Sequence, residues 1–250
     1  MKFIPYVCCG DPNLEFTEKL VETLSEHADI IELGIPFSDP IADGKTIQQA
    51  AARALKNGVT VEKIFEMVKR LRIKLKTPFV FMTYYNIVYS YGKEKFLNKM
   101  KELEVQGLII PDLPFGEDPE FEKIAKEKEI SIINLIAMNT PKERARKILE
   151  KEGMFTYLVS VSGVTGARSE IDGKSLEFVK RIREIGPQNK LCVGFGISNA
   201  ENANKFVNAG AEGVIVGSMI VEMYSKGKTP EEYIEEIKKF SQGFKKTNKN

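Results

Sequence analysis

Short apolar segments alternate with longer amphipathic segments along the whole sequence. Residues 3–8 form an apolar, β-rich run that predicts a strand, and residues 14–26 have the periodicity of a helix with one buried face. The same strand–helix alternation occurs eight times. The later predicted strands are residues 30–34, 78–83, 108–110, 130–137, 155–161, 191–195 and 213–216, and the later predicted helices are residues 46–56, 61–75, 93–103, 118–128, 141–152, 175–185, 200–209 and 231–240.

Strands that alternate with helices of about 10 to 15 residues are typical of parallel βαβ units. Eight such units in 250 residues predict an α/β protein with a single domain, a (β/α)8 TIM barrel over residues 1–250 whose polar tail, residues 245–250, frays. A doubly wound sheet is the alternative, but it usually has fewer strands and a glycine-rich fingerprint after the first one. Here the first strand ends in Cys9-Gly10-Asp11-Pro12, which favours the barrel.

The composition is that of a globular protein without a global attraction to polyanions or lipid. Hydrophobic residues make up 42%, charged residues 29%, and the net charge is +2. Lysines alternate with glutamates along the predicted helices, so no basic stripe for nucleic acid forms. No apolar run approaches the roughly 20 residues of a membrane span, and the first residues lack signal-peptide features. We therefore expect a cytoplasmic protein that binds neither nucleic acid nor membranes.

The cysteines and the single histidine limit the kinds of catalytic and metal-binding site that the chain can form. Cys8 and Cys9 are adjacent and point to opposite faces of a strand, and Cys192 stands alone, so we expect free thiols. The single histidine, His27, lies on a polar turn, which argues against a histidine-based metal site or a Ser-His-Asp triad. We expect no metal, and chemistry that uses carboxylates, tyrosine, lysine, cysteine or backbone groups.

Two carboxylates stand where a barrel places its active site, at the carboxyl ends of the strands. If Ile31 and Leu33 pack outward, Glu32 faces the lumen, where burial would raise its pKa and make it an acid or base near neutral pH. The alternative is an ion pair with a lysine or arginine. Asp43 follows in a proline-rich loop, and its alternative role is the N-cap of the next helix.

Glycine-bearing turns follow the last three predicted strands, at residues 162–167, 194–198 and 217–219. Glycine lets backbone N–H groups approach an anion, and barrels often bind phosphate after strands seven and eight. The turns therefore indicate a phosphorylated ligand, held by backbone groups and Ser218. Tyr157 lies in the middle of its predicted strand, where it is either a lumen hydroxyl or a core aromatic side chain.

The motifs together resemble one family, the alpha subunit of tryptophan synthase. The segment Ile31-Glu32-Leu33-Gly34-Ile35-Pro36-Phe37-Ser38-Asp39-Pro40-Ile41-Ala42-Asp43-Gly44, followed by Thr46-Ile47-Gln48, is similar to that family's signature. Gly10-Asp11-Pro12 and residues 157–160, 163–167, 194–198 and 217–218 also match, in the family's order. The resemblance extends from residue 3 to residue 240.

This resemblance implies a lyase that cleaves indole-3-glycerol phosphate by retro-aldol chemistry to indole and glyceraldehyde 3-phosphate. It also implies roles for individual residues. The catalytic residues would be Glu32, which acts as acid and base, Asp43, which bonds the indole N–H, and Tyr157, which lines the site beside them. Substrate and phosphate would be bound by Tyr6, Thr165, Gly166, Gly196, Gly217 and Ser218, with an Asp43–Thr165 contact that closes the loop over the site.

The resemblance further implies a partner. A pyridoxal-phosphate beta subunit would form an alpha2beta2 complex with this chain, which itself carries no cofactor, and would receive indole for tryptophan synthesis. The loop over residues 36–43 would report occupancy of the alpha site to that partner. Many family members carry an extra helix before the first strand, and we expect it to be missing here because residue 3 already begins a strand.

Two other functions are considered. One is another phosphate-binding barrel, such as a sugar-phosphate epimerase or isomerase, which usually needs histidine metal ligands or a lysine base at a strand end. The other is a catalytically silent barrel that regulates a partner. The presence of Glu32, Asp43, Thr165 and Ser218 favours the retro-aldol enzyme over both.

Overall fold

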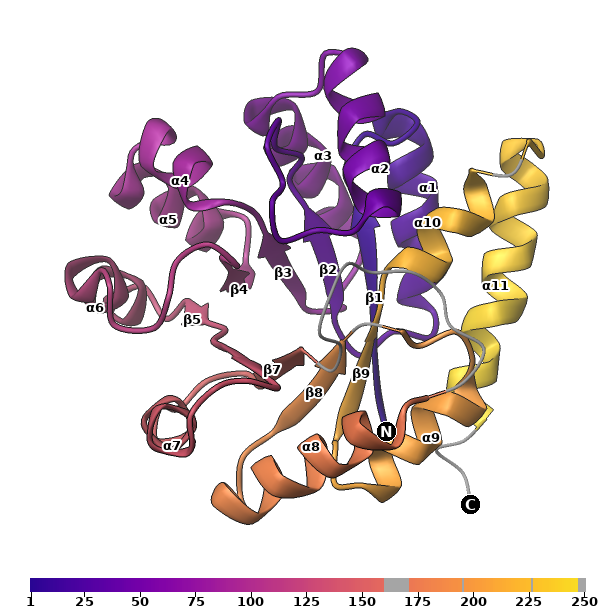
Figure 1. Cartoon of the computed structure of the whole chain (residues 1–250). Coiled ribbons are helices and arrows are strands. Elements are labelled where there is room, and N and C mark those ends of the chain that lie inside the picture. Colours follow the sequence, from indigo (N-terminus) through magenta and orange to yellow (C-terminus); the bar gives the residue numbers. More distant parts are fainter. Residues whose placement is uncertain (160–170, 195, 226, 247–250) are drawn as a thin grey trace.

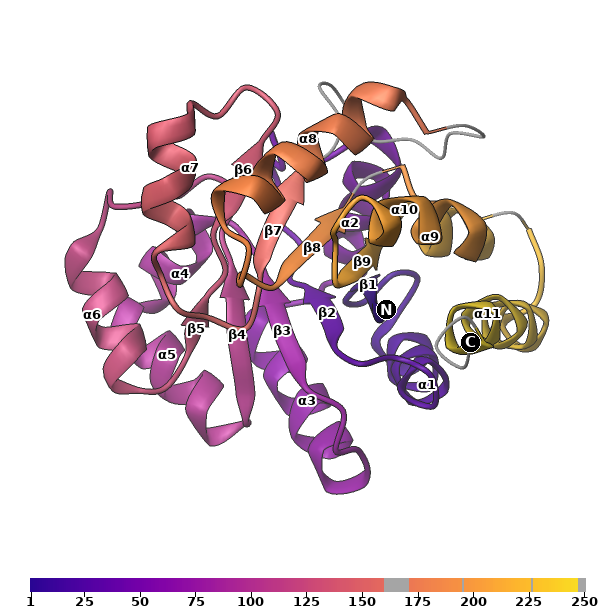
Figure 2. The same cartoon turned by 90° about the horizontal axis from the view of Figure 1, so that it is seen from below.

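Parallel strands form one continuous sheet in the computed structural model, which describes residues 1–159, 171–194, 196–225 and 227–246. The strands are β1 (Lys2–Cys8), β2 (Ile31–Gly34), β3 (Phe79–Met82), β4 (Val105–Ile109), β5 (Ser131–Ile132), β6 (Leu135–Ala137), β7 (Thr156–Val159), β8 (Leu191–Gly194) and β9 (Gly213–Val216). Helices surround the strands, as Figures 1 and 2 show. The architecture is the predicted TIM barrel.

The barrel has eight strand positions although the described sheet contains nine strands in the order β5-β4-β3-β2-β1-β9-β8-β7-β6. β5 pairs with β4 and β6 pairs with β7, and only Ile133 and Asn134 separate the two. The Ile133 N–H donates to Leu108 and the Tyr157 N–H donates to Asn134, so the interruption connects both neighbours. The predicted strand over residues 130–137 is therefore one barrel strand broken into two pieces.

The helices cover the outside of the barrel. They are α1 (Leu14–Ser25), α2 (Lys45–Lys56), α3 (Val61–Lys74), α4 (Tyr85–Tyr91), α5 (Lys93–Glu102), α6 (Pro119–Glu127), α7 (Lys142–Leu149), α8 (Gly173–Ile185), α9 (Ala200–Asn208), α10 (Ser218–Tyr224) and α11 (Pro230–Lys246). The predictions missed α4 and α10, which are short, and α11 continues through Lys245 and Lys246, where we predicted fraying.

Side-chain caps define where several helices begin. The side chains of Asn13, Thr60, Asp118, Asp172 and Asn199 each accept a hydrogen bond from a backbone N–H in the first turn of their helix. Such a cap satisfies one of the N–H groups that the helix itself leaves without a partner. The caps end the connecting loops and set the entry points of the helices around the barrel.

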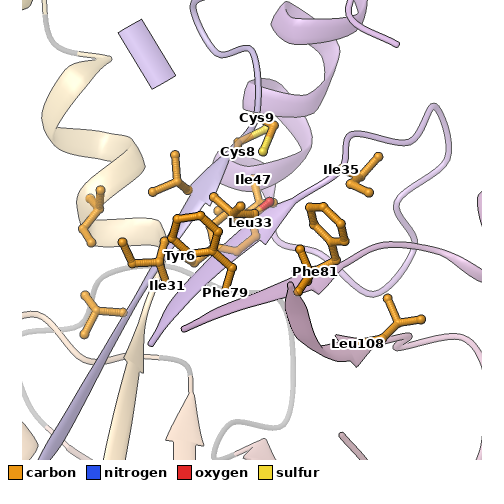
Figure 3. Close-up of a cluster of buried hydrophobic side chains, with 14 of the residues drawn as sticks. Tyr6, Cys8, Cys9, Ile31, Leu33, Ile35, Ile47, Phe79, Phe81 and Leu108 are labelled. Carbon is orange, nitrogen blue, oxygen red and sulfur yellow. The ribbon is translucent and has the colours of Figure 1, made fainter. Parts of the chain in front are cut away.

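Alternation along the strands divides the apolar residues into two clusters. Outward-facing side chains such as Ile31, Leu33, Phe79 and Phe81 join the large core between strands and helices, part of which Figure 3 shows. Inward-facing side chains fill the lower lumen; this second cluster contains Ile4, Ile30, Val80, Ile109, Ile133, Phe155, Tyr157, Cys192 and Ile215. The lumen is thus closed by packing, and space for a ligand remains only toward the carboxyl ends of the strands.

The three cysteines are free and buried, as predicted. None of the described helices is long and apolar enough to span a membrane.

Candidate active site

A cavity lies at the carboxyl ends of the strands. Its empty volume is about 920 Å³, which includes the space at its mouth that is continuous with solvent. Side chains and turns from both halves of the barrel line it. Its polar lining comes from Tyr6, Glu32, Asp43, Tyr157 and Ser218, and its apolar lining includes Ile47, Met82, Ile109, Leu135, Ile197, Ile215 and Met219. The structure therefore brings five sequence-predicted side chains together in a mostly apolar pocket.

Glu32 projects into the lumen because its neighbours in β2, Ile31 and Leu33, pack outward into the core. The residue is only 2% exposed. Burial, and secondarily the nearby Asp43 carboxylate, raises the pKa of Glu32 to about 8. Among the described residues Glu32 has no ion pair, and its Oε2 atom has no hydrogen-bond partner. The alternative of a structural ion pair is therefore not supported, and Glu32 is protonated near neutral pH.

Asp43 lies at the end of the β2–α2 loop and is 7% exposed. Its Oδ2 accepts a hydrogen bond of 2.8 Å from the Tyr84 hydroxyl. Burial raises the pKa of Asp43 to about 6, and the Tyr84 hydrogen bond opposes that rise. The N-cap position of α2 is Gly44, without a side-chain cap, so Asp43 is not the N-cap. Near pH 7 the site thus combines a neutral Glu32 with an ionised Asp43.

Two tyrosines from different strands line the cavity. Tyr6 on β1 and Tyr157 on β7 are 7% and 8% exposed, and each lies across the end of the next strand in the sheet. A Cβ atom at Gly34 would lie 2.2 Å from Oη of Tyr6, and one at Gly194 would lie 2.2 Å from Oη of Tyr157. Both tyrosine rings therefore depend on a glycine at the neighbouring strand end. Tyr157 combines both predicted roles, since it packs in the lumen cluster and also lines the cavity.

The glycine turns after β8 and β9 line the other side of the cavity through Gly196, Gly217 and Ser218. Gly196 has a φ of 75°, in the left-handed region that favours glycine. A Cβ at Gly217 would lie 3.3 Å from Cβ of Tyr6, so this turn also packs closely against β1. Thr165 and Gly166, and with them the Asp43–Thr165 contact, lie outside the described residues.

One polar side chain and most of the apolar wall were not predicted from the sequence. Tyr84 directly follows the strand region of β3 and bonds Asp43, although 41 positions separate the two residues. Met82, Ile109 and Leu135 occupy inward positions near the ends of their strands. An inward position at a strand end was the available signal for these three apolar residues, but we applied it only to carboxylates, glycines and Tyr157.

The described residues contain no group of three or more His, Cys, Asp and Glu side chains arranged to hold a metal ion. A mostly apolar pocket with a neutral acid beside an ionised carboxylate suits proton transfer to a bound aromatic or carbonyl compound. Backbone N–H groups and a hydroxyl on the opposite side suit an anionic group of the same ligand.

Comparison with known proteins gives one consistent family. The family model described as "Tryptophan synthase alpha chain" matches residues 1–249. The tryptophan synthase alpha chain of Methanocaldococcus jannaschii is 45% identical over 239 residues, which cover 95% of this chain and 84% of the relative. That of Methanococcus vannielii is 43% identical over 254 residues, covering 98% of both.

Solved structures agree with the sequence relatives. A structure from Pyrococcus furiosus, described as the tryptophan synthase alpha2beta2 complex and its mutual activation, is 43% identical with a TM-score of 0.90 and 97% coverage of both chains. A mutant of the alpha subunit from the same organism is 41% identical with a TM-score of 0.89 and the same coverage. The similarity thus extends over the barrel and the loops of its mouth.

Proposed function

The chain belongs to the tryptophan synthase alpha chain family, and from this premise we propose that its cavity cleaves indole-3-glycerol phosphate to indole and glyceraldehyde 3-phosphate with Glu32 and Asp43 as catalytic residues. The observation that carries the proposal is the pairing of a buried carboxyl with a raised pKa and a second, ionised carboxylate in one apolar pocket.

Glu32 supplies the proton that the reaction needs. Breaking the bond at C3 of indole directly would expel a carbanion, which is a poor leaving group. When Glu32 donates its proton to C3, the ring becomes an iminium-like cation that can take up the bonding electrons. The Glu32 carboxylate then accepts the proton of the glyceryl hydroxyl as the carbon–carbon bond breaks, which yields the aldehyde, neutral indole and a reprotonated Glu32. A placed proton transfer of this kind contributes about 10²–10⁴ in rate.

Asp43 supports the charge that develops on the ring. Its ionised carboxylate accepts a hydrogen bond from the indole N–H and stabilises the cation formed by protonation at C3. Because Asp43 is buried, this interaction is stronger than it would be in water. Tyr6 and Tyr157 confine the indole ring between them, and Tyr157 extends toward the Glu32 side of the cavity.

The phosphate group is assigned to the opposite side of the cavity. Gly196, Gly217 and Ser218 offer backbone N–H groups and one hydroxyl there. Thr165 and Gly166 remain predicted contributors, the first as the residue that bonds Asp43 when the loop closes.

The chain's partner follows from the family. We propose that a beta subunit carrying pyridoxal phosphate joins this chain in an alpha2beta2 complex in the cytoplasm, that this chain itself needs no cofactor, and that its reaction is that of a carbon–carbon lyase. The loop that ends in Asp43 also carries Ile41, an apolar side chain that is 81% exposed. An exposed apolar residue two positions from a catalytic carboxylate suits a loop that reports occupancy of the site to that subunit.

Indole release from indole-3-glycerol phosphate, with and without the beta subunit, tests the proposal. We expect Glu32→Gln and Asp43→Asn to lower kcat by about 10²–10⁴ relative to wild type. Glu150→Gln removes an exposed carboxylate of similar size and serves as control. The assignment is wrong if wild type with its partner is no faster than Glu32→Gln.

A further inference from the structure

Tyr84 contacts the loop between β2 and α2 at both of its ends. The residue lies between β3 and α4 and is 2% exposed. Its ring stacks on Phe37, near the start of the loop, with centroids 5.2 Å apart and an angle of 27° between the planes. Its hydroxyl reaches Ala42 and Asp43 at the other end of the loop. One side chain thus connects the beginning of the loop with its catalytic carboxylate.

The hydrogen bonds at the Tyr84 hydroxyl have a fixed direction. The Ala42 N–H can only donate, so at 3.0 Å the Tyr84 oxygen must accept from it. The hydroxyl proton is then free to point at Asp43 Oδ2, 2.8 Å away. An Oδ2 that accepts this proton belongs to an ionised Asp43 or to one protonated on Oδ1. With Oδ2 occupied, Oδ1 is the carboxylate oxygen left for a ligand N–H.

The backbone around Asp43 is held by other groups. Gln48 Nε2 donates to the Asp43 carbonyl oxygen at 2.9 Å, and the Asp43 N–H donates to Pro40 at 3.0 Å. At the start of the loop the Ile35 N–H donates to Met82 at 2.9 Å. Removal of the Tyr84 hydroxyl therefore leaves these main-chain hydrogen bonds and the ring stack on Phe37, but it takes the acceptor from the Ala42 N–H and releases the Asp43 carboxylate.

We propose that Tyr84 is a positioning residue of the reaction, whose hydroxyl orients the Asp43 carboxylate by binding Oδ2 and so leaves Oδ1 for the ligand N–H. The inference rests on the proposed function for what Asp43 does with its ligand. It adds the group that orients Asp43 for that task. Asp43 lines the cavity, and Tyr84 contacts it from behind that lining.

The ionisable groups around Asp43 also support a role for the Tyr84 hydroxyl. The ionisable groups that face it are Glu32 on β2, Tyr6 and Cys8 on β1, and Tyr157 on β7. Each of these is neutral near pH 7. Burial raises the pKa of Glu32 to about 8, and it raises further the pKa values of the tyrosine and cysteine side chains, which ordinarily lie above 7 already. None of them compensates the burial of the Asp43 charge as a cation would. The Tyr84 hydrogen bond is the contact that lowers the pKa of Asp43, so its loss moves that pKa upward.

Tyr84→Phe tests the inference, with Tyr85→Phe as the matched control. Tyr85 is the next residue, and its hydroxyl bonds Asp118 on the outside of the barrel. We expect Tyr84→Phe to lower kcat for indole release by about ten- to a hundredfold at pH 7, the range of a hydrogen bond to a charged group. The deficit should grow as the pH falls from 8 to 6, because Asp43 of the variant becomes protonated at a higher pH than in wild type and then no longer carries the negative charge that stabilises the ring cation. Tyr85→Phe should stay within about twofold of wild type.

A double-mutant cycle and an NMR titration complete the test. In an Asp43→Asn background, Tyr84→Phe should cost no more than about twofold, since its effect passes through the carboxylate. The ¹³C titration of the Asp43 carboxyl should move to higher pH in Tyr84→Phe, and this readout does not depend on the reaction. The inference is overturned by an unchanged Asp43 titration, a pH-independent deficit or an undiminished effect in Asp43→Asn. Failure of the proposed function would instead appear as wild type releasing no indole.

Discussion

The two sides of the barrel mouth carry different kinds of polar group. On the side of β1 to β3, the functional groups are side chains that are nearly fully buried, namely Glu32, Asp43 and Tyr84. On the side of β8 and β9, they are backbone groups and the half-buried Ser218. Proton transfer needs carboxyl groups whose pKa values are shifted by burial, whereas an anion needs N–H donors that keep contact with solvent. Under the proposed function, the first side carries the chemistry and the second binds the phosphate.

The largest effect that separates the two sides is the pH dependence of kcat/KM. We expect a bell-shaped profile with limbs near pH 6 and pH 8, because Asp43 must be ionised and Glu32 protonated. Beyond each limb the rate should change by about tenfold per pH unit. Steady-state rates from pH 5 to 9 measure this. A flat profile between pH 5 and 8 would remove the carboxylate side from the chemistry.

The next effect is on the free energy of unfolding, and comparing wild type with Glu32→Gln isolates the contribution of Glu32. A group whose pKa is raised on folding stabilises the protein fully below its unfolded pKa and loses that contribution as the pH rises through its folded pKa, here from about 4.5 to about 8. Glu32→Gln should therefore gain at least about 1 kcal/mol in free energy of unfolding, relative to wild type, when the pH is raised from 5 to 9. Denaturant unfolding at the two pH values measures the difference; an equal difference at both would mean that Glu32 is not desolvated.

The smallest effect concerns the phosphate side. Ser218→Ala removes one hydroxyl donor but leaves the backbone donors of the glycine turns, so KM should rise about five- to tenfold while kcat stays within about twofold. Steady-state kinetics with Ser90→Ala, an exposed serine on α4, as control distinguish this from a general loss of activity. If Ser218→Ala lowered kcat as much as Asp43→Asn does, the division of the site into a catalytic side and a phosphate-binding side would be wrong.

Much of the fold was predictable because alternation and periodicity are local properties. β9 was predicted with both ends correct, and Glu32 was placed in the lumen from the apolar residues on either side of it. The break at Ile133 and Asn134 was not predictable from a continuous apolar run. On either side of it the first piece pairs with β4 and the second with β7, a division that depends on where the neighbouring strands lie and not on the local sequence.

The candidate site divides in the same way. Glu32, Asp43 and the glycine turns have local signals, since each stands in a strand or in the loop that follows one, within a recognisable sequence motif. Tyr84 does not, because its role depends on a distance between residues 41 positions apart in the chain. A tyrosine after a buried strand is by itself an ordinary core residue. Only the folded loop turns it into a partner of Asp43.

The pairing of β1 with β9 has a consequence for how the chain folds. Pro5 lies beside Val216, so this pair joins the two ends of the sequence, whereas all other paired strands described are successive in the chain. The units between them can form by local crossovers, each closing a short loop. The last pair must close a loop that spans most of the chain, and its entropic cost is repaid only when both halves of the barrel are present. We therefore expect the β1–β9 contact to form late, after which both sides of the active site face each other for the first time.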